Sequence, residues 1–235
     1  DAKTAVDAAK GAADTAKENA EKAEQAISDL DAKADKAADK VNNYYDLGSL
    51  LTRLNDYQQA EELFMKALGI FEAKGDKDAM NLLNYGLGNL YYEIGKVNEA
   101  IKLYNKIDDP KLKADSYLML AQSYMKKGQY KQAVAYGLTA LELRPDDPEI
   151  NQVIGDSLLA LGEFKQAKAY YDAILKYHPG RADTQFNRGI VAMVLGEPYK
   201  DYLAQAKQLD PNYYHKSEQR LNDIEKTLQA TQKKD

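Results

Sequence analysis

The feature that most constrains the fold of this chain is a segment that occurs twice, 34 residues apart. Residues 128–145 read GQYKQAVAYGLTALELRP and residues 162–179 read GEFKQAKAYYDAILKYHP, with eight identities in eighteen positions. Repetition at an interval of this length is typical of solenoids, in which a unit buries its apolar face only by stacking on its neighbours. The interval therefore predicts a row of similar units that share a continuous core.

Turn residues and small residues recur with the same period. Glycines near the middle of successive units lie 33, 34 and 34 residues apart, at Gly95, Gly128, Gly162 and Gly196. An alanine stands five residues after Asn55, Gly95, Gly128 and Gly162, at Ala60, Ala100, Ala133 and Ala167. A large apolar residue followed by a small one precedes each turn, as Leu47-Gly48, Leu87-Gly88, Leu120-Ala121, Ile154-Gly155 and, in a weaker copy, Arg188-Gly189.

These markers predict two helices in each unit. The apolar residues between them have helical spacing, a glycine ends the first helix, and a proline separates one unit from the next. Four of the six prolines have that place, namely Pro110, Pro145, Pro179 and Pro211. Small residues at fixed positions let the backbones of two helices approach closely, so each unit is expected to be a tight helical hairpin.

The order Leu-Gly, Tyr, Gly-x-Tyr, Ala and Pro resembles the tetratricopeptide repeat family. The resemblance divides residues 41–211 into five hairpins, at 41–74, 81–110, 114–145, 148–179 and 182–211. It implies an all-α fold, a right-handed superhelical solenoid of paired helices. The first unit has a longer exit and the fifth is two residues short. Residues 212–235, with apolar Leu221, Ile224 and Leu228, are expected to form a capping helix with a polar outer face.

The first forty residues have a different pattern. Apolar residues follow each other at alternating steps of four and three from Ala2 to Val41, and the bulky ones, Val6, Ile27, Leu30 and Val41, all lie on this seam. A heptad seam of this kind predicts a long helix that packs on a partner, although alanine also favours helix without any partner. We expect residues 1–40 to serve in homo-oligomerisation, as a tether, or in packing on the groove of the solenoid.

Two further resemblances concern this segment. It is similar to the alanine-rich coils of bacterial outer-membrane lipoproteins, and a coil before tetratricopeptide units resembles periplasmic proteins that oligomerise through such a coil. The sequence leaves the compartment open, and these resemblances favour an extracytoplasmic bacterial setting, either periplasmic or lipid-anchored.

Composition and motifs argue against catalysis. The chain has no cysteine, and its two histidines, His178 and His215, stand without partners at metal-ligand or triad spacing. No phosphate-binding glycine loop is present. A net charge of −5 argues against non-specific nucleic-acid binding, and the longest apolar run, residues 190–195, is too short to span a membrane. We therefore predict no enzyme, no metal, no cofactor, no nucleic-acid partner and no transmembrane segment in this chain.

A protein or peptide partner is the remaining expectation. In the family, the first helix of each unit lines a concave groove with one row of side chains, which we call the inner stripe. In this chain the inner stripe includes Asn89, Asp156 and Leu159 among others. The places that hold a terminal carboxylate in some relatives carry Tyr45, Asp115 and Met119, which cannot form such a clamp. The predicted peptide-binding residues are Tyr45, Tyr85, Asn89, Tyr92, Leu118, Gln122, Met125 and Phe186.

Two functions remain open at this point. The first is a non-catalytic protein–protein interaction scaffold that binds an apolar or amphipathic peptide or helix in its groove, because tyrosine and aliphatic side chains suit such a ligand. The alternative is a structural oligomeric spacer or tether assembled through the alanine-rich coil of residues 1–40.

Overall fold

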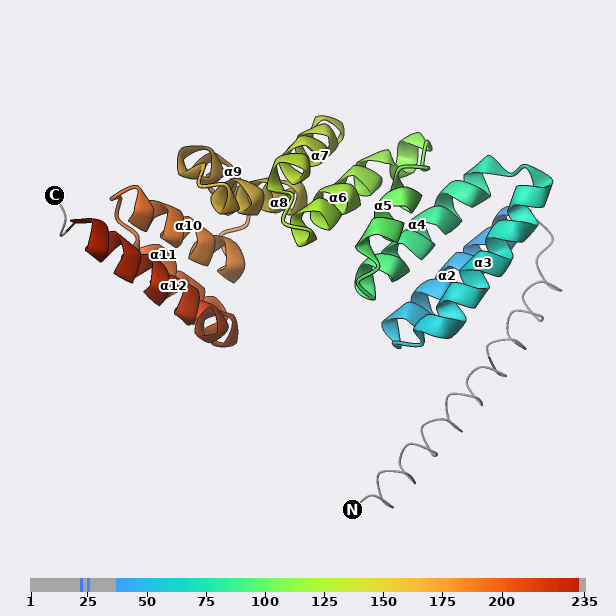
Figure 1. Cartoon of the computed structure of the whole chain (residues 1–235), viewed down its shortest axis with the longest axis horizontal. Helices are drawn as coiled ribbons and strands as arrows, with labels where there is room; N and C mark the ends of the chain where they lie inside the picture. Colours follow the sequence, from blue (N-terminus) through green and yellow to red (C-terminus); the bar gives the residue numbers. More distant parts are fainter. Residues whose placement is uncertain (1–21, 23–24, 26–36, 233–235) are drawn as a thin grey trace, which may run out of the picture. The chain divides into compact units, whose positions relative to one another are not determined.

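The computed structural model describes residues 22, 25 and 37–232, and every regular element among residues 37–232 is an α-helix. The predicted heptad helix of residues 1–40, with its seam and its role in assembly, lies almost wholly outside the described residues. The helices are α2 (Ala37–Arg53), α3 (Tyr57–Lys74), α4 (Lys77–Glu93), α5 (Val97–Tyr104), α6 (Pro110–Lys126), α7 (Tyr130–Leu143), α8 (Pro148–Ala160), α9 (Phe164–Tyr177), α10 (Ala182–Val194), α11 (Lys200–Leu209) and α12 (Pro211–Gln232) (Figure 1). The prediction of an all-α fold is confirmed for the residues that the structure describes.

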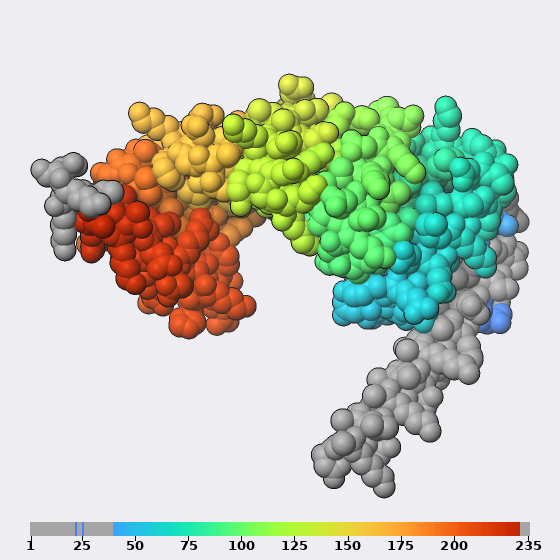
Figure 2. Space-filling model, viewed as in Figure 1, coloured from blue at the N-terminus to red at the C-terminus, as the bar shows by residue number. Residues whose placement is uncertain are grey.

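The helices group into two compact units. Unit 1 extends to Ser116 and unit 2 begins at Tyr117, so that α6 crosses the boundary. In unit 1, α3 packs on both α2 and α4, and α5 packs on α4. In unit 2, α7 to α11 pack each on the next, and α12 contacts both α11 and α10. Figure 2 shows α12 in red at the surface of unit 2.

The turns between paired helices have the geometry that the repeat predicts. Gly95, Gly128, Gly162 and Gly196 all have positive φ angles, between 71° and 82°, and Asn55 has the same place in the first unit with φ 61°. In the third unit the Gln129 N–H donates to the Tyr124 carbonyl oxygen at 2.9 Å, which closes the helix end as a Schellman motif. Glycine and asparagine are the residues that adopt this left-handed conformation at least cost, so the period marks the helix ends.

The small residue of each Leu-Gly pair receives a large side chain from the second helix. A Cβ added to Gly88 would lie 2.7 Å from Tyr104 Cε1, and one added to Gly155 would lie 2.8 Å from Tyr171 Cε1. The ring in each case comes sixteen positions later, and Phe64 has the same relation to Gly48. In the fifth unit Leu203 lies against Gly189 after only fourteen positions, since that unit is two residues short.

The third unit inverts this arrangement. Its small residue is Ala121, and the position sixteen residues later is Gly137, which carries no side chain to fill the space. Ile154 of α8 lies there instead, because a Cβ added to Gly137 would be 2.6 Å from Ile154 Cγ1. The space inside this hairpin is therefore filled by a residue of the next one.

The recurrent alanines lie in the cores, as predicted. Ala60, Ala100, Ala133 and Ala167 are each fully buried. The core of unit 1 contains Phe64, Phe71 and Leu83, while that of unit 2 forms two clusters, around Tyr171 and around Phe186. The long exit of the first unit is a long helix, since α3 runs for 18 residues before Gly75 ends it at φ 67°.

Candidate functional site

Four of the predicted site residues belong to unit 1, on α2 and α4. Tyr45, Tyr85, Asn89 and Tyr92 are all partly exposed. Tyr45 packs close to the α4 backbone, since a Cβ added to Gly86 would lie 3.1 Å from its Cδ2 atom. Burial raises the pKa of Tyr45 and that of Tyr92, so both phenols are neutral near pH 7. The Asn89 side-chain oxygen accepts a 2.8 Å hydrogen bond from the Tyr104 hydroxyl, which leaves its amide NH₂ directed elsewhere.

The other four predicted residues belong to unit 2. Leu118, Gln122 and Met125 lie on α6 and are partly exposed, whereas Phe186 on α10 is fully buried. The Phe186 ring makes T-shaped contacts with two tyrosines of α12, and its centroid lies 5.9 Å from that of Tyr213 and 5.6 Å from that of Tyr214. Phe186 is therefore closed to a ligand while α12 is in place. Because the eight residues are divided between two units, their union in one continuous surface stays a prediction.

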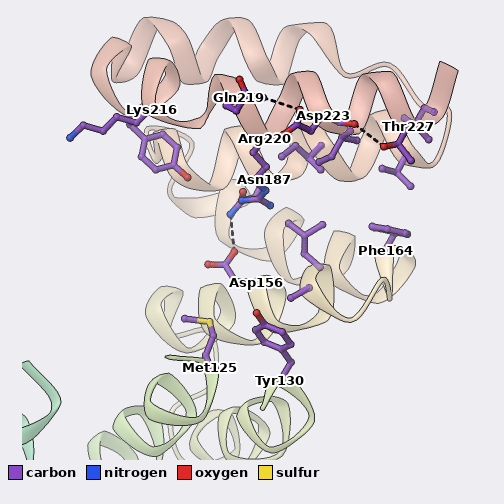
Figure 3. Close-up of a pocket in the computed structure, with 17 residues that line it drawn as sticks. Met125, Tyr130, Asp156, Phe164, Asn187, Lys216, Gln219, Arg220, Asp223 and Thr227 are labelled. Carbon is purple, nitrogen blue, oxygen red and sulfur yellow. Dashed lines mark hydrogen bonds between the residues drawn. The ribbon is translucent and has the colours of Figure 1, made fainter. Parts of the chain in front are cut away.

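A groove in unit 2 is the clearest candidate site. It encloses about 1210 Å³ between α8 and α10 on one side and α12 on the other, with Met125 and Tyr130 at one end (Figure 3). We call this cavity the α12 groove. Its apolar lining is Leu159, Ala160, Phe164, Ile190, Val194, Ile224 and Leu228. Its polar lining is Asp156 and Asn187 on the helices of the hairpins, and Tyr213, Lys216, Gln219, Arg220, Asp223 and Thr227 on α12.

A carboxylate lies at the centre of the polar lining. Asp156 Oδ1 accepts hydrogen bonds from the Tyr171 hydroxyl at 2.7 Å, from Asn187 Nδ2 at 2.8 Å and from Gln152 Nε2 at 2.9 Å. Its Oδ2 atom accepts none from the residues that the structure describes. Burial raises the pKa of Asp156, and the three hydrogen bonds and the charge of Arg220 oppose that shift.

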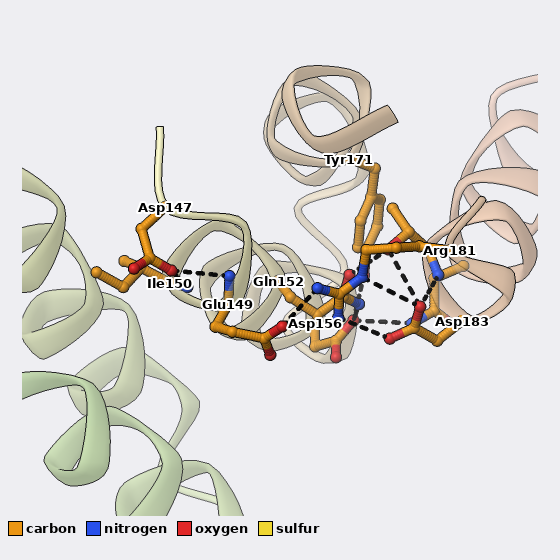
Figure 4. A network of polar contacts seen from close by, with 10 residues as sticks. Asp147, Glu149, Ile150, Gln152, Asp156, Tyr171, Arg181 and Asp183 are labelled. Atoms are coloured by element: carbon orange, nitrogen blue, oxygen red, sulfur yellow. Dashed lines mark hydrogen bonds and ion pairs between the residues drawn. The ribbon is translucent and has the colours of Figure 1, made fainter. Parts of the chain in front are cut away.

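A second layer of polar contacts fixes this carboxylate in place. The Thr184 hydroxyl of α10 donates to Gln152 Oε1 at 2.6 Å, and Gln152 in turn donates to Asp156 (Figure 4). Arg181, at the start of α10, pairs with Glu149 on α8 and with Asp183. These contacts join α8 to α10, so the groove wall that carries Asp156 and Asn187 is a fixed surface.

Two further polar residues of the lining, Asn187 and Arg220, lie near Asp156. Asn187 is only 5% exposed, and its Oδ1 atom accepts no hydrogen bond from the described residues. Arg220 lies on the opposite wall, facing Asn187 from α12, and is exposed (Figure 3). Polar atoms in this state on a groove with apolar walls are typical of a binding surface.

Asp156 is the repeat counterpart of Asn89. Both follow the small residue of the pair, Gly155 or Gly88, and both accept a hydrogen bond from the tyrosine fifteen positions later. Asp156 lies on the predicted inner stripe but is not among the predicted peptide-binding residues. The shared spacing of fifteen positions between the acceptor and its tyrosine could have identified Asp156. The roles of Asn187 and Arg220 depend on how α12 packs, which the repeat does not encode.

Other classes of site have less support. Among the described residues, no cluster of three or more histidine, aspartate or glutamate side chains could ligate a metal. Within the same part of the chain, no helix combines the length and the apolar character that crossing a bilayer requires.

Comparison with protein families gives three overlapping matches along the hairpins. Models described as "Tetratricopeptide repeat" match residues 39–107, 85–148 and 124–186. Together the three matches cover the chain from residue 39 to residue 186.

Several solved structures have a similar fold. YrrB, described as a TPR protein with an unusual peptide-binding site, is 26% identical, with a TM-score of 0.57 over 72% of this chain and 86% of that one. PilF of Pseudomonas aeruginosa has a TM-score of 0.63 at 19% identity, over 77% of this chain and 81% of that one. A structure of MamA has a TM-score of 0.58 at 19% identity, over 72% and 91% of the two chains.

Two curated relatives are much longer than this chain. The Type II methyltransferase M.CeqI of Rhodococcus hoagii is 24% identical over 92% of the chain, which spans 44% of that protein. The human Protein O-mannosyl-transferase TMTC1 is 24% identical over 80% of the chain, which spans 22% of it. The chain thus spans less than half the length of both.

Proposed function

Because the chain belongs to the tetratricopeptide repeat family, we propose that it is a non-catalytic interaction scaffold that binds a peptide or helix of a partner protein. The α12 groove is the principal binding site. The observation that carries this proposal is a groove of about 1210 Å³ that combines an apolar lining with a buried acceptor, Asn187 Oδ1, which accepts no hydrogen bond from the described residues. Such a surface suits an amphipathic segment, since its apolar face is buried and its polar atoms are paired at the same time.

Two further observations support a peptide as the ligand. YrrB, which is 26% identical to this chain, is described by its peptide-binding site. In unit 1, Tyr45, Tyr85 and Tyr92 present partly exposed rings on α2 and α4 beside the Asn89 amide. Tyrosines offer a large contact area at a small cost in conformational entropy, so this tyrosine face is a second region for the same partner.

Selection of peptides tests the proposal. A phage-displayed library of random dodecapeptides is panned on the immobilised full-length chain, and the affinity of the selected peptides is measured by calorimetry. Val194→Arg places a charge in the α12 groove and should weaken binding about tenfold or more, because the apolar face of the peptide loses its contact.

The matched control is Leu143→Arg, at a residue of α7 that is 51% exposed and does not line the groove. It should leave the affinity unchanged. Equal affinities for the two variants would place the binding site elsewhere and refute the α12 groove as the site. Denaturant unfolding of both variants confirms that any loss of binding is not a loss of folding.

A further inference from the structure

Two polar residues that lie next to each other in the lining of the α12 groove, Asp156 and Asn187, are joined by a hydrogen bond. Asn187 donates its amide N–H to Asp156 Oδ1 at 2.8 Å, and an ionised carboxylate only accepts, so the amide orientation is fixed. The Asn187 oxygen is therefore left for another donor, and this buried atom accepts no hydrogen bond from the described residues. Asp156 adds its Oδ2 atom, which likewise accepts none from them. Near Asp156 and Asn187 the groove therefore offers a ligand hydrogen-bond acceptors and no donor.

The negative charge of Asp156 is incompletely compensated. The three groups that donate to Asp156 are a phenol and two amides, all of them neutral. The cation that acts on it is Arg220, an exposed residue of α12. No ion pair joins the two residues at 4 Å or less in the part of the chain that the structure describes. A partly buried carboxylate in this setting is stabilised when a cation forms a direct hydrogen bond with it.

We propose that the α12 groove recognises a basic side chain of the bound segment, an arginine or a lysine, through Asp156 Oδ2 and Asn187 Oδ1. The inference rests on the proposed function and specifies the ligand for the same site. A guanidinium suits the pair better than an ammonium, because its planar N–H groups can engage two neighbouring oxygens at once. The flanking residues of the segment are apolar, to match Leu159, Ile190 and Ile224 on either side.

Arg220 is the intramolecular competitor for this position. It lies on the opposite wall of the groove, and its charge acts on Asp156. A cation of the ligand replaces Arg220 as the charge that stabilises Asp156. Because the two cations repel each other, Arg220 weakens the binding of such a ligand. Replacing Arg220 by glutamine should therefore raise the affinity for a basic segment. A groove that instead binds an acidic ligand requires Arg220, and the same replacement lowers its affinity.

Asp156→Asn removes the negative charge and keeps an oxygen that can accept the hydrogen bonds of Asp156. The oxygen of the new amide can still accept from Tyr171, Gln152 and Asn187, while its NH₂ replaces the groove-facing Oδ2 atom. The chain already uses asparagine at this repeat position, because Asn89 accepts from Tyr104 in the same way. The variant is therefore expected to fold, and thermal unfolding by circular dichroism checks this.

The experiment uses the dodecapeptides selected on the wild-type chain, each compared with a version in which its basic residue is glutamine. On the wild type that exchange should weaken binding about tenfold or more, and on Asp156→Asn about threefold or less. Arg220→Gln should tighten binding of the basic peptide. Equal losses on the wild type and on Asp156→Asn, or selected peptides without a conserved basic residue, overturn the inference but leave the proposed function standing. A library that yields no binder, or only binders insensitive to Val194→Arg, overturns both.

Discussion

The Tyr171 ring lies directly against Gly155, so close that a Cβ on this glycine would be 2.8 Å from ring atom Cε1. The ring fills the volume that a side chain would occupy, and its hydroxyl then reaches Asp156, the next residue along α8. The same relation joins Tyr104 to Gly88 and Asn89 in unit 1. The same packing requirement therefore positions Asn89 and Asp156 in these two hairpins.

Gly155→Ala and Gly88→Ala should each lower the free energy of unfolding by about 1–3 kcal/mol, because the added methyl group overpacks the tyrosine ring. The control is Gly69→Ala on α3, where nothing lies within 4 Å of an added Cβ. It should be neutral or stabilising by up to about 1 kcal/mol, since alanine is the better helix former. Denaturant unfolding measures all three, and similar values for Gly88→Ala and Gly69→Ala would contradict the packing argument.

Gly128→Ala should cost about 1–2 kcal/mol of stability although there is open space around this residue. The reason is its φ angle of 71°, which an alanine adopts only with strain. Gly128→Asn should cost less, since Asn55 has this conformation in the first unit at φ 61°. The unfolding free energies of the two variants decide the point, and an equal cost for both would mean that the turn changes its conformation.

Tyr171→Phe should destabilise the protein more than Tyr104→Phe does. The first removes a donor from a carboxylate, which costs about 1.5–3 kcal/mol, and the second removes a donor from a neutral amide, which costs about 0.5–1.5 kcal/mol. Both rings are buried at equivalent places, so the loss of packing is matched. In an Asp156→Asn background the difference between the two variants should disappear. A difference that persists there would show that the charge of Asp156 is not its origin.

Asp156→Asn should change the pH dependence of stability in a defined direction. Burial raises the pKa of Asp156 in the folded state above its ordinary value of 3.8. The folded chain then binds this proton more tightly than the unfolded chain does, so stability falls as the pH rises through the interval between the two pKa values. Tyr171 and Tyr213, which face the carboxylate, have raised phenol pKa values and stay neutral across that interval, and the charge of Arg220 also acts on this carboxylate.

The stability of Asp156→Asn relative to the wild type should accordingly be greater at pH 7 than at pH 3. Urea unfolding of both proteins at the two pH values measures this difference, in which the contributions of all other groups cancel. A relative stability that is the same at both pH values would show that the carboxylate titrates alike in the folded and unfolded chains.

Tyr92→Ala and Tyr85→Ala should weaken the binding of a partner that uses unit 1 by about 2 kcal/mol or more if these rings are anchors. Their effect on unfolding should be smaller than that of Ala167→Leu, which enlarges a fully buried residue. Calorimetry with the selected peptides and crosslinking to the tyrosine face provide the measurement. Unchanged affinity in both variants would restrict binding to unit 2.

The sequence predicted the fold because the repeat records backbone requirements. A left-handed turn residue, a fully buried alanine and a small residue beneath a ring each admit few side chains, and so Gly128, Ala133 and Gly155 appear with the same period. The site was less accessible to this reasoning. Phe186 has an apolar side chain at a stripe position, but whether it is open or covered depends on how α12 packs, and no repeat constrains that helix.

Asp156 was overlooked for a related reason. In isolation an acidic residue on a helix is usually solvated, and only its hydrogen bonds with Tyr171 and Asn187 distinguish it from the others. The tyrosine could have been inferred from its counterpart Tyr104, which stands fifteen positions after Asn89. Asn187 lies in the following hairpin, and its orientation depends on tertiary contacts.

The contact of Gly137 with Ile154 of the next hairpin bears on how the repeats of such a chain can be rearranged during evolution. The α4–α5 hairpin carries both Gly88 and the Tyr104 ring that fills it, so it could be duplicated or lost as a complete module. The α7 helix depends on Ile154 of the hairpin that follows. Loss of α8 and α9 would leave Gly137 facing an empty space, unless the next hairpin brought a side chain of the same size. The boundary between α7 and α8 is therefore a place where insertion, deletion or recombination of repeats is selected against.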